Sequence, residues 1–299
     1  MGLPRELWVQ AVNENLFASL SKILPAATDD SAYKNGKTIH VPEAGTAAGI
    51  LKNPARPLTI STRTDNELTY DLDEWVMPPT VNPFPDANQL SYDKLQSLIN
   101  DIMGNIGYRA MREFLINWYP GATYKVSTSG SSYADHAPGA TGNSKGLTLA
   151  DLEAARKSLN DQEFPESDRY LLVDYTMSAQ LRADIGVTTY RDVAAGYDVN
   201  KGILPMLAGF SIIEVPAVAF VTSANVVRAY GHAGATTDQA LALAVHKSAL
   251  SYCTGDIKIF DSMNDAIMVG DVVSGAVWAG AKYRRYSAKG VIPIIQVNA

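Results

Sequence analysis

The sequence is poor in the residues that usually build disulfides and metal sites. It contains one cysteine, Cys253, among 299 residues, so a disulfide within the chain and a multi-cysteine zinc module are both excluded. No two histidines stand three or four residues apart, the spacing at which a helix presents a pair of metal ligands. We therefore predict no metal and no cofactor. The four histidines are His40, His136, His232 and His246.

Charge is also scarce. Charged residues make up 19% of the chain, below the roughly 25% of an average soluble domain, which favours a surface partly covered by other chains. The 25 basic and 31 acidic residues give a net charge of −6, which argues against a dedicated nucleic-acid binder. No apolar run reaches the roughly 18–20 residues of a membrane span. The first ten residues lack the pattern of a secretory signal, so we expect cytoplasmic synthesis and no membrane partner.

The N-terminal region predicts an amphipathic helix followed by a polar segment. Apolar residues recur at helical spacing from Trp8 to Ile23, and Pro25 ends the pattern over residues 5–24. The polar stretch AATDDSAYKNGK then separates this helix from the rest of the sequence. We therefore expect residues 1–36 to form an arm rather than a part of the core.

A short strand is predicted over 38–42, and a β-hairpin follows it. Apolar and polar residues alternate over 58–63 and again over 68–72, with the pair Asp65-Asn66 between the two runs. An isolated two-stranded hairpin is at best marginally stable in water. Since the flanking sequence offers loops rather than a packing partner, we expect the hairpin at 56–76 to lie on a neighbouring subunit.

The strongest pattern in the sequence predicts a long helix over 91–118. Its apolar residues keep helical spacing from Leu95 to Trp118, and Ser91 is a favourable N-cap. At 1.5 Å per residue such a helix is roughly 42 Å long. The segment 121–146 that follows is rich in Gly, Ser and Thr and predicts a flexible loop.

The rest of the chain mixes helical and strand patterns, which indicates an α+β fold with an α/β unit over 147–255. Thr236 and Gln239 have the spacing of a capping box, so we predict a helix over 236–253. From Ile267 to Tyr283 the apolar period is two, which predicts an unusually long strand. The remaining predicted elements are helices over 147–159 and 176–184 and strands over 169–173, 210–215, 219–221 and 291–297.

One motif could carry catalysis. Residues 142–146, GNSKG, match the G-x-S-x-G pattern of esterase nucleophiles, and a helix is predicted after them. The strand that should precede the serine is missing, because the preceding residues are typical of a loop. A serine esterase that uses Ser144 with Asp174 and either His232 or His246 is therefore a distant alternative. His246 and Cys253 are more simply explained as structural residues.

Two charged clusters favour contacts between subunits. Residues 282–286, KYRRY, would place their basic side chains on both faces of a strand, which favours ion pairs over a nucleic-acid patch. The carboxylates at the end of the hairpin also alternate between faces and require basic partners. The candidates for contacts between subunits are Arg56, Arg63, Asp65, Asp71, Asp73, Glu74, Lys282, Arg284 and Arg285.

The order of these elements resembles a known family. An N-terminal arm, a charged hairpin, a long helix, an α/β unit and a long late strand resemble the major capsid proteins of tailed bacteriophages, which have the Hong Kong 97-type fold. The resemblance covers nearly the whole chain. The segments that carry it are VPEAGTAAGILKNPARP, DEWVMPPTVNPFPDANQLSYDKLQSLI, LTLADLEAARKSLNDQEFPESDRYLLVDYTMSAQL and ALAVHKSALSYCTGDIKIFD.

The resemblance implies a division of the chain into the parts of that fold. These parts are an N-terminal arm (1–36), a peripheral domain (37–55, 77–120 and 256–289, with the spine helix 91–118), an extended hairpin loop (56–76), a flexible loop (121–146) and an axial domain (147–255 and 290–299).

The resemblance also implies a structural protein without catalysis. Copies of the chain would assemble through pentamers and hexamers into an icosahedral or prolate shell around double-stranded DNA, within the virion capsid and after assembly in the host bacterial cytoplasm. Implied partners are other copies, a separate scaffolding protein, a portal and decoration proteins, with the packaged DNA contacted weakly. The alternative within the same fold is the shell of an encapsulin-like nanocompartment.

Overall fold

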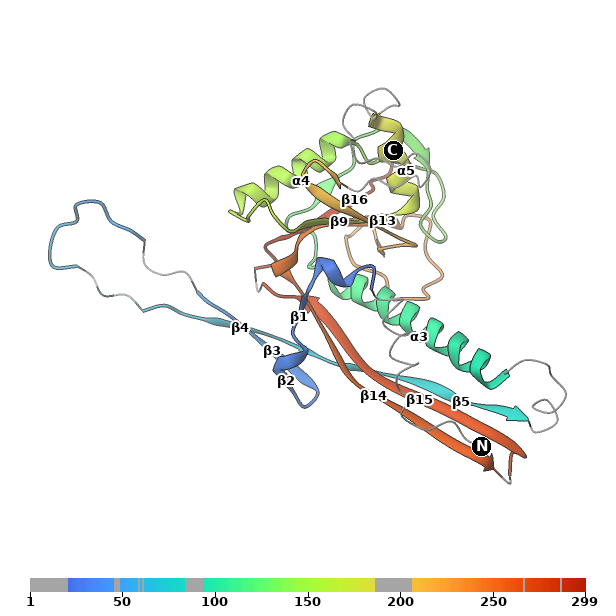
Figure 1. Cartoon of the computed structure of the whole chain (residues 1–299). Helices are drawn as coiled ribbons and strands as arrows, with labels where there is room; N and C mark the ends of the chain where they lie inside the picture. The colour runs from blue at the N-terminus through green and yellow to red at the C-terminus, as the bar shows by residue number, and fades with distance from the viewer. Residues whose placement is uncertain are drawn as a thin grey trace.

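The computed structural model describes residues 21–45, 49–58, 60, 62–83, 94–185, 206–265, 267–285 and 287–299. Within these residues the chain has a mixed α+β fold, built on a seven-stranded sheet, a long four-stranded sheet and one long helix (Figure 1). Most of the helix predicted over 5–24 lies outside the described residues.

The seven-stranded sheet is covered on both faces. Alternate residues of β13 enter two separate clusters, with Leu241, Leu243 and Val245 on one face and the alanines at 240, 242 and 244 on the other. The strands run in the order β10-β11-β9-β13-β16-β6, with β12 beside β13. Their bounds are β6 (Val126–Ser127), β9 (Arg169–Asp174), β10 (Met206–Leu207), β11 (Phe210–Val215), β12 (Ala219–Val221), β13 (Gln239–His246) and β16 (Val291–Ile295).

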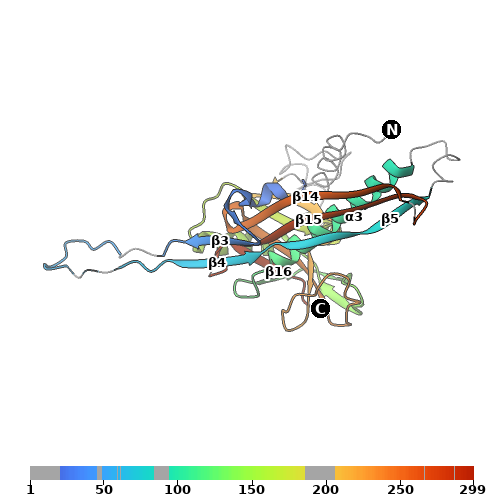
Figure 2. The same ribbon diagram turned by 90° about the horizontal axis from the view of Figure 1, so that it is seen from below.

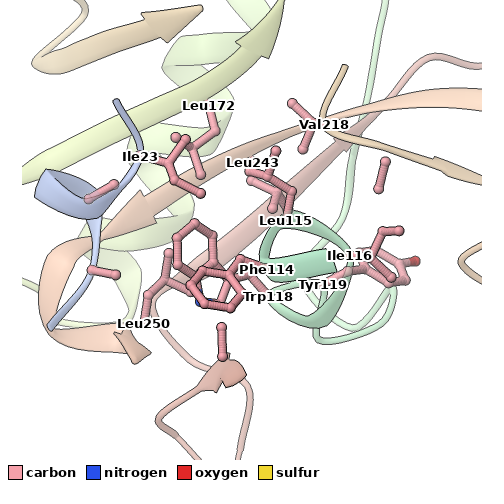
Figure 3. Packing of buried hydrophobic residues seen from close by; sticks show 14 of the residues in the cluster. Ile23, Phe114, Leu115, Ile116, Trp118, Tyr119, Leu172, Val218, Leu243 and Leu250 are labelled. Carbon is pink, nitrogen blue, oxygen red and sulfur yellow. The ribbon is translucent and has the colours of Figure 1, made fainter. Parts of the chain in front are cut away.

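Different helices cover the two faces of the seven-stranded sheet. α4 (Leu149–Asp161) and α5 (Tyr175–Ile185) pack on the alanine face of β13, and α4 begins with a capping box between Thr148 and Asp151. The C-terminal half of α3 (Lys94–Asn117) packs on the opposite face, where Phe114, Leu115 and Trp118 are buried (Figure 3). The predictions of these three helices are confirmed.

The long sheet extends away from the first sheet alongside α3 (Figure 1). Its order is β1-β14-β15-β5, with β1 parallel to β14 and the other pairs antiparallel. The long strand predicted over 267–283 is confirmed, although it begins at Gly270. The bounds are β1 (Thr28–Asp29), β5 (Asp73–Pro83), β14 (Leu250–Asp265) and β15 (Gly270–Tyr283).

The predicted hairpin pairs differently from the expectation. β4 (Asn66–Asp71) pairs with β3 (Thr38–Glu43) along its whole length, and β3 also pairs with β2 (Lys34–Asn35). The run 58–63 is therefore not the partner of 68–72. The described residues between Glu43 and Asn66 form no strand. The loop therefore extends over 44–65 instead of belonging to a hairpin at 56–76, and the ends of β3 and β4 form its foot.

The described part of the predicted arm belongs to the core. Ile23 and Ala26 are fully buried in the cluster that contains Phe114, and Thr28 and Asp29 form β1 beside β14. Two short 3-10 helices, η1 (Leu24–Ala26) and η2 (Ser31–Tyr33), turn the chain there. For residues 21–36, the expectation of a free arm is wrong, because apolar residues anchor this segment.

Two further expectations need correction. The helix predicted over 236–253 is wrong, because this segment forms β13, the short η3 (Lys247–Ala249) and the start of β14. The segment 121–146 contains, besides β6, the paired strands β7 (Ser132–Ala134) and β8 (Asn143–Lys145). Residues 121–146 therefore contain paired strands, whereas their Gly- and Ser-rich composition predicts a flexible loop.

Candidate assembly surfaces

The loop between β3 and β4 projects far from the rest of the molecule (Figures 1 and 2). At its foot the backbone N–H of Gly45 donates to Asp65 Oδ1 at 2.8 Å. Beyond that point its apolar side chains lie in solvent, and none of those described is buried. Several exposed apolar residues in one segment are typical of a surface that contacts another molecule. The exposed apolar residues are Ile50, Leu51, Leu58 and Ile60.

A second exposed apolar surface lies at the turn between β14 and β15, at the opposite end of the molecule (Figure 2). Ile267, Met268 and Val269 are exposed there, together with Phe260 on β14. Asp265 Oδ1 accepts hydrogen bonds from the backbone N–H groups of Ile267 and Met268 at 2.8 and 3.1 Å. These bonds hold the pKa of the Asp265 carboxyl below its usual value. The turn is therefore ordered by its own aspartate while it presents apolar side chains to solvent.

Half of the predicted contact residues around the loop have partners within the chain. Arg63 Nε lies 2.6 Å from Asp65 Oδ1, and the hydrogen bond from Arg63 lowers the pKa of Asp65. Asp71 Oδ1 accepts a hydrogen bond from Thr38 Oγ1 at 2.7 Å. Arg56, Asp73 and Glu74 are exposed, and the described part of the chain offers them no ion pair. These last three stay candidates for contacts between subunits.

The basic cluster at the end of β15 makes contacts within the chain. Lys282 Nζ donates to the backbone oxygen of Thr69 at 2.9 Å, and Arg284 Nη2 donates to Asp30 Oδ1 at 3.1 Å. Arg285 Nη1 lies 3.7 Å from Glu43 Oε1. Lys282, Arg284 and Arg285 therefore have partners within the chain, and contacts of these residues with another subunit stay a prediction. The partners of these basic residues come from the foot of the loop, which supplies Thr69 and Glu43, and from the N-terminal segment, which supplies Asp30.

A buried polar cluster joins four parts of the fold, and we call it the Asp30 network. Ser251 Oγ donates its hydrogen to Asp30 Oδ2. Because the hydroxyl has only that one hydrogen, Ser251 Oγ accepts from the hydroxyl of Tyr70, 2.7 Å away. Trp118 Nε1 donates to the backbone oxygen of Ser251 at 2.9 Å. Burial raises the pKa of Tyr70, which keeps its hydroxyl protonated as a donor. The members are Asp30, Tyr70, Trp118, Ser251 and Arg284.

The arrangement required for a serine esterase is not formed by the predicted residues. Ser144 is only 2% exposed, so a substrate has no access to its hydroxyl. Asp174 Oδ2 contacts His136 Nε2 at 2.7 Å, whereas His246 contacts Ser248 and His232 contacts Gly234. The His136–Asp174 pair fastens the loop after β7 to the start of α5. Sequence reasoning missed it, because 38 residues separate the two.

The structural interpretation of Cys253 and His246 is confirmed. Cys253 is fully buried, and burial raises the pKa of its thiol. His246 is 7% exposed, and its Nδ1 accepts from the backbone N–H of Ser248 at 3.2 Å. In the ranges that the structure describes, no group of three or more His, Cys, Asp and Glu side chains could hold a metal ion. No helix in those ranges has the length and apolar character to span a membrane.

Comparison with known proteins identifies the fold. No family model matches the sequence, and no curated protein matches it by sequence. The capsid of the cyanophage P-SCSP1u is similar, with a TM-score of 0.67 and 17% identity over 92% of this chain and 87% of that one. Mycobacterium phage Che8 has a TM-score of 0.60 and 16% identity over 90% and 89%. The capsid of a native GTA particle has a TM-score of 0.61 and 10% identity over 93% and 90%. The chain therefore has the fold of tailed-phage capsid proteins.

Proposed function

We propose that this chain is the major capsid protein of a tailed bacteriophage. Copies of it would build a closed icosahedral or prolate shell around double-stranded DNA, as a structural protein without catalysis. The observation that carries the proposal is the likeness to phage capsids over about nine-tenths of the chain. The protruding loop supports it, because the loop's described apolar residues are exposed, as is typical of surfaces that contact a neighbouring molecule.

The parts of the fold then take their roles in the shell. The seven-stranded sheet with α4 and α5 would be the axial domain, for which the sequence predicts 147–255 and 290–299. β6 adds residues 126–127 to its sheet, and residues 250–255 belong to β14 of the long sheet. The long sheet with α3 as the spine helix would be the peripheral domain. We take the extended loop as 44–65, because β4 pairs with β3 and so sets the foot of the loop.

Assembly would join unlike surfaces of neighbouring copies. The loop and the β14–β15 turn expose apolar side chains at opposite ends of one molecule, so neither can cover the other within a single chain. A contact between two different patches is heterologous, and such contacts close into rings when the rotation between copies allows it. Ion pairs between subunits would come from Arg56, Asp73 and Glu74. Such pairs fix how two subunits align more than they raise the affinity between them.

Electron microscopy of the purified chain tests the shell directly. We expect closed particles in negative stain when the chain is produced with its scaffolding protein. Particles filled with DNA support a virus, and particles that hold protein cargo instead favour the encapsulin-like alternative. A chain that stays a small oligomer under every assembly condition contradicts both.

Shortening the loop tests its role separately. We would replace 46–63 with a short Gly-Ser linker and retain Gly45 and Asp65, so that the foot of the loop is preserved. We expect a folded, soluble chain that no longer closes shells. The matched control is Met206→Ser, which removes an exposed apolar side chain outside the loop. Normal shells from the shortened chain would show that the loop is dispensable.

The remaining partners and the location follow from the same proposal. A separate scaffolding protein, a portal and decoration proteins would meet this chain in the host cytoplasm, and the finished shell would be part of the virion.

A further inference from the structure

A pocket of about 220 Å³ lies between the C-terminal half of α3 and the segment that joins β12 to β13. Its apolar walls include Ile116 and Phe220, and its polar lining is dominated by hydrogen-bond donors. Arg112 comes from α3, and Arg228 and His232 come from the segment after β12. The donors and their partners show what this pocket can bind.

Arg112 is a buried guanidinium without a counter-ion among the described residues. Its side chain lies over the rings of Phe220 and Tyr230, with ring centres 5.9 and 6.0 Å away. It is 8% exposed, and it donates one hydrogen bond, from Nη1 to the backbone oxygen of Ala217. Its Nε is buried and meets no acceptor in the described part of the chain. A buried charge in this state is costly unless an anion joins it.

Asp238, the carboxylate among the residues that line the pocket, already has hydrogen-bond partners for both of its oxygens. Asp238 is 1% exposed, and its two oxygens accept from Arg228 Nε and Nη2 at 2.7–3.1 Å. Asp238 Oδ2 also accepts from the backbone N–H of Ala235 at 3.0 Å. The hydrogen bonds from Arg228 lower the pKa of Asp238, so it is ionised at neutral pH. Asp238 therefore neutralises Arg228 and leaves Arg112 uncompensated.

His232 adds a further donor to the same pocket. The backbone N–H of Gly234 donates to His232 Nδ1 at 2.8 Å, so Nδ1 carries a lone pair rather than a hydrogen. In the neutral ring the hydrogen is then on Nε2. Arg228 Nη1 lies 3.4 Å from this Nε2. A neutral ring cannot accept at both nitrogens, so the shorter bond from Gly234 assigns the hydrogen to Nε2 and leaves Nη1 and Nε2 as two neighbouring donors. Two donors this close together need an acceptor oxygen that lies beside both of them.

From this arrangement we infer that the pocket is a binding site for an oxyanion, either a carboxylate or a phosphate group. Its oxygens would accept from Arg228 Nη1 and His232 Nε2 and would supply the charge that Arg112 lacks. Such charge-assisted hydrogen bonds are the strong ones in proteins. The oxyanion could be free in solution or could be an acidic side chain of a second copy. The inference rests on the pocket alone and does not depend on the proposed shell.

Titration of the unassembled full-length chain with sodium phosphate tests the site. Calorimetry and the thermal midpoint would be measured at constant ionic strength, with chloride as the reference anion. His232→Asn retains an acceptor for the Gly234 N–H but removes the Nε2 donor, and Arg112→Lys retains the charge but changes the donor geometry. We expect each variant to weaken phosphate binding about tenfold, the usual effect of one lost bond to a charged group. Arg156→Lys on α4 is the matched control and should bind as the wild type does.

Sedimentation equilibrium in the same buffers distinguishes the two sources of the oxyanion. If phosphate weakens self-association of the wild type but not of His232→Asn, the site holds an acidic side chain of a second copy. If self-association is unchanged while phosphate binds, the site holds a free anion. The inference is overturned if phosphate stabilises the wild type no more than chloride does. It is also overturned if His232→Asn, folded with a wild-type thermal midpoint, binds phosphate as tightly as the wild type.

Discussion

The Asp30 network fixes segments that are far apart in the sequence. Asp30 and Arg284 are separated by 254 residues and Tyr70 and Ser251 by 181, yet all meet at one buried point. A buried carboxylate is tolerated only when ion pairs and hydrogen bonds compensate its lost hydration. Each member of the network therefore depends on the others, and the network holds β4 and the segment around Asp30 against the long sheet and the end of α3.

Asp30→Ala should lower the free energy of unfolding by about 2–3 kcal/mol, since it leaves Arg284 and Ser251 without their partner. Chemical denaturation of the unassembled chain measures this. Lys157→Ala is the control, because its ion pair with Asp161 is exposed to solvent and should contribute little to stability. A loss in Asp30→Ala as small as that of the control would mean that the network is not a stabilising element.

His246 should make folding sensitive to mild acid. Burial, with help from Arg169 and Arg285 and against the effect of Asp168, lowers the pKa of His246 below 6.5. Between the lowered value and 6.5 the unfolded chain binds more protons, so stability rises with pH across that window and falls as the pH drops below 6.5.

The variant His246→Asn separates this contribution from others. Asparagine can still accept from the backbone N–H of Ser248, and it does not titrate. We expect the free energy of unfolding to depend less steeply on pH between 7 and 5 in the variant than in the wild type. Equal slopes would show that another group controls stability in this range.

Single residues were the hardest features to predict from the sequence. The pattern shows that Arg284 and Arg285 are charged, but not that Asp30 and Glu43 lie beside them. Likewise nothing local marks Arg112 and His232 as neighbours in one pocket. Partners at long range are set by the topology, and a one-residue change in strand register would exchange them.

At the scale of elements, β13 shows why a strand was mistaken for a helix. In ALALAV the even positions are alanine and the odd positions leucine or valine, so both faces are apolar. A strand buried on both faces has no polar alternation, and periodicity alone does not distinguish it from a buried helix. The alternation of size is nevertheless present, with small residues toward α4 and α5 and large ones toward α3.

The foot of the loop shows why the partner of strand 68–72 was predicted wrongly. Both 58–63 and 38–43 have strand-like alternation, and a short turn at Asp65-Asn66 favours 58–63 as the partner of 68–72, because hairpins with short turns are common. The structure pairs β4 with β3 across a connection of 44–65. Loop closure costs little more for a longer loop, so proximity in sequence was weak evidence. By contrast, helices with one apolar stripe, such as α3, were predicted well.

Phe114 on α3 provides a test of the spine helix. It is 1% exposed and packs with Trp118 in the cluster between the two sheets. Phe114→Ala should lower the free energy of unfolding by about 3–5 kcal/mol, because a large cavity would form there. Tyr108→Ala is the control on the same helix, since Tyr108 is 39% exposed. Leu98 and Ile102, predicted to share this stripe, lie where the structure does not describe side chains.

At the scale of the whole molecule, the acidic balance limits contact with DNA. With a net charge of −6, the isolated chain should bind duplex DNA no more tightly than the ~10⁻⁴–10⁻⁶ M of non-specific binding, with little dependence on salt. Fluorescence anisotropy at physiological ionic strength measures this. Submicromolar binding would reveal a basic surface that the overall charge conceals.

A closed shell must place one sequence in rings of five and of six, so some contacts have to differ between copies. The parts that can adapt are those with few contacts of their own. The described residues of 44–65 have exposed apolar side chains, and none of them is buried. Residues 21–36, in contrast, are fixed by Ile23 and by the Asp30 network. The difference between copies should therefore begin at the loop foot, where the pairing of β3 and β4 ends at Glu43 and Asn66.

We predict that independently refined copies in one particle superpose closely over both large sheets, α4, α5 and residues 21–36, and diverge over 44–65. A cryo-electron microscopy map of the shell provides the comparison, with each copy in the asymmetric unit built separately. Copies whose loops are identical and whose differences lie within the seven-stranded sheet would contradict the prediction. That outcome would require the apolar clusters on the two faces of the sheet to pack differently in different copies. Such repacking costs stability, because close-packed protein interiors tolerate changes of volume poorly.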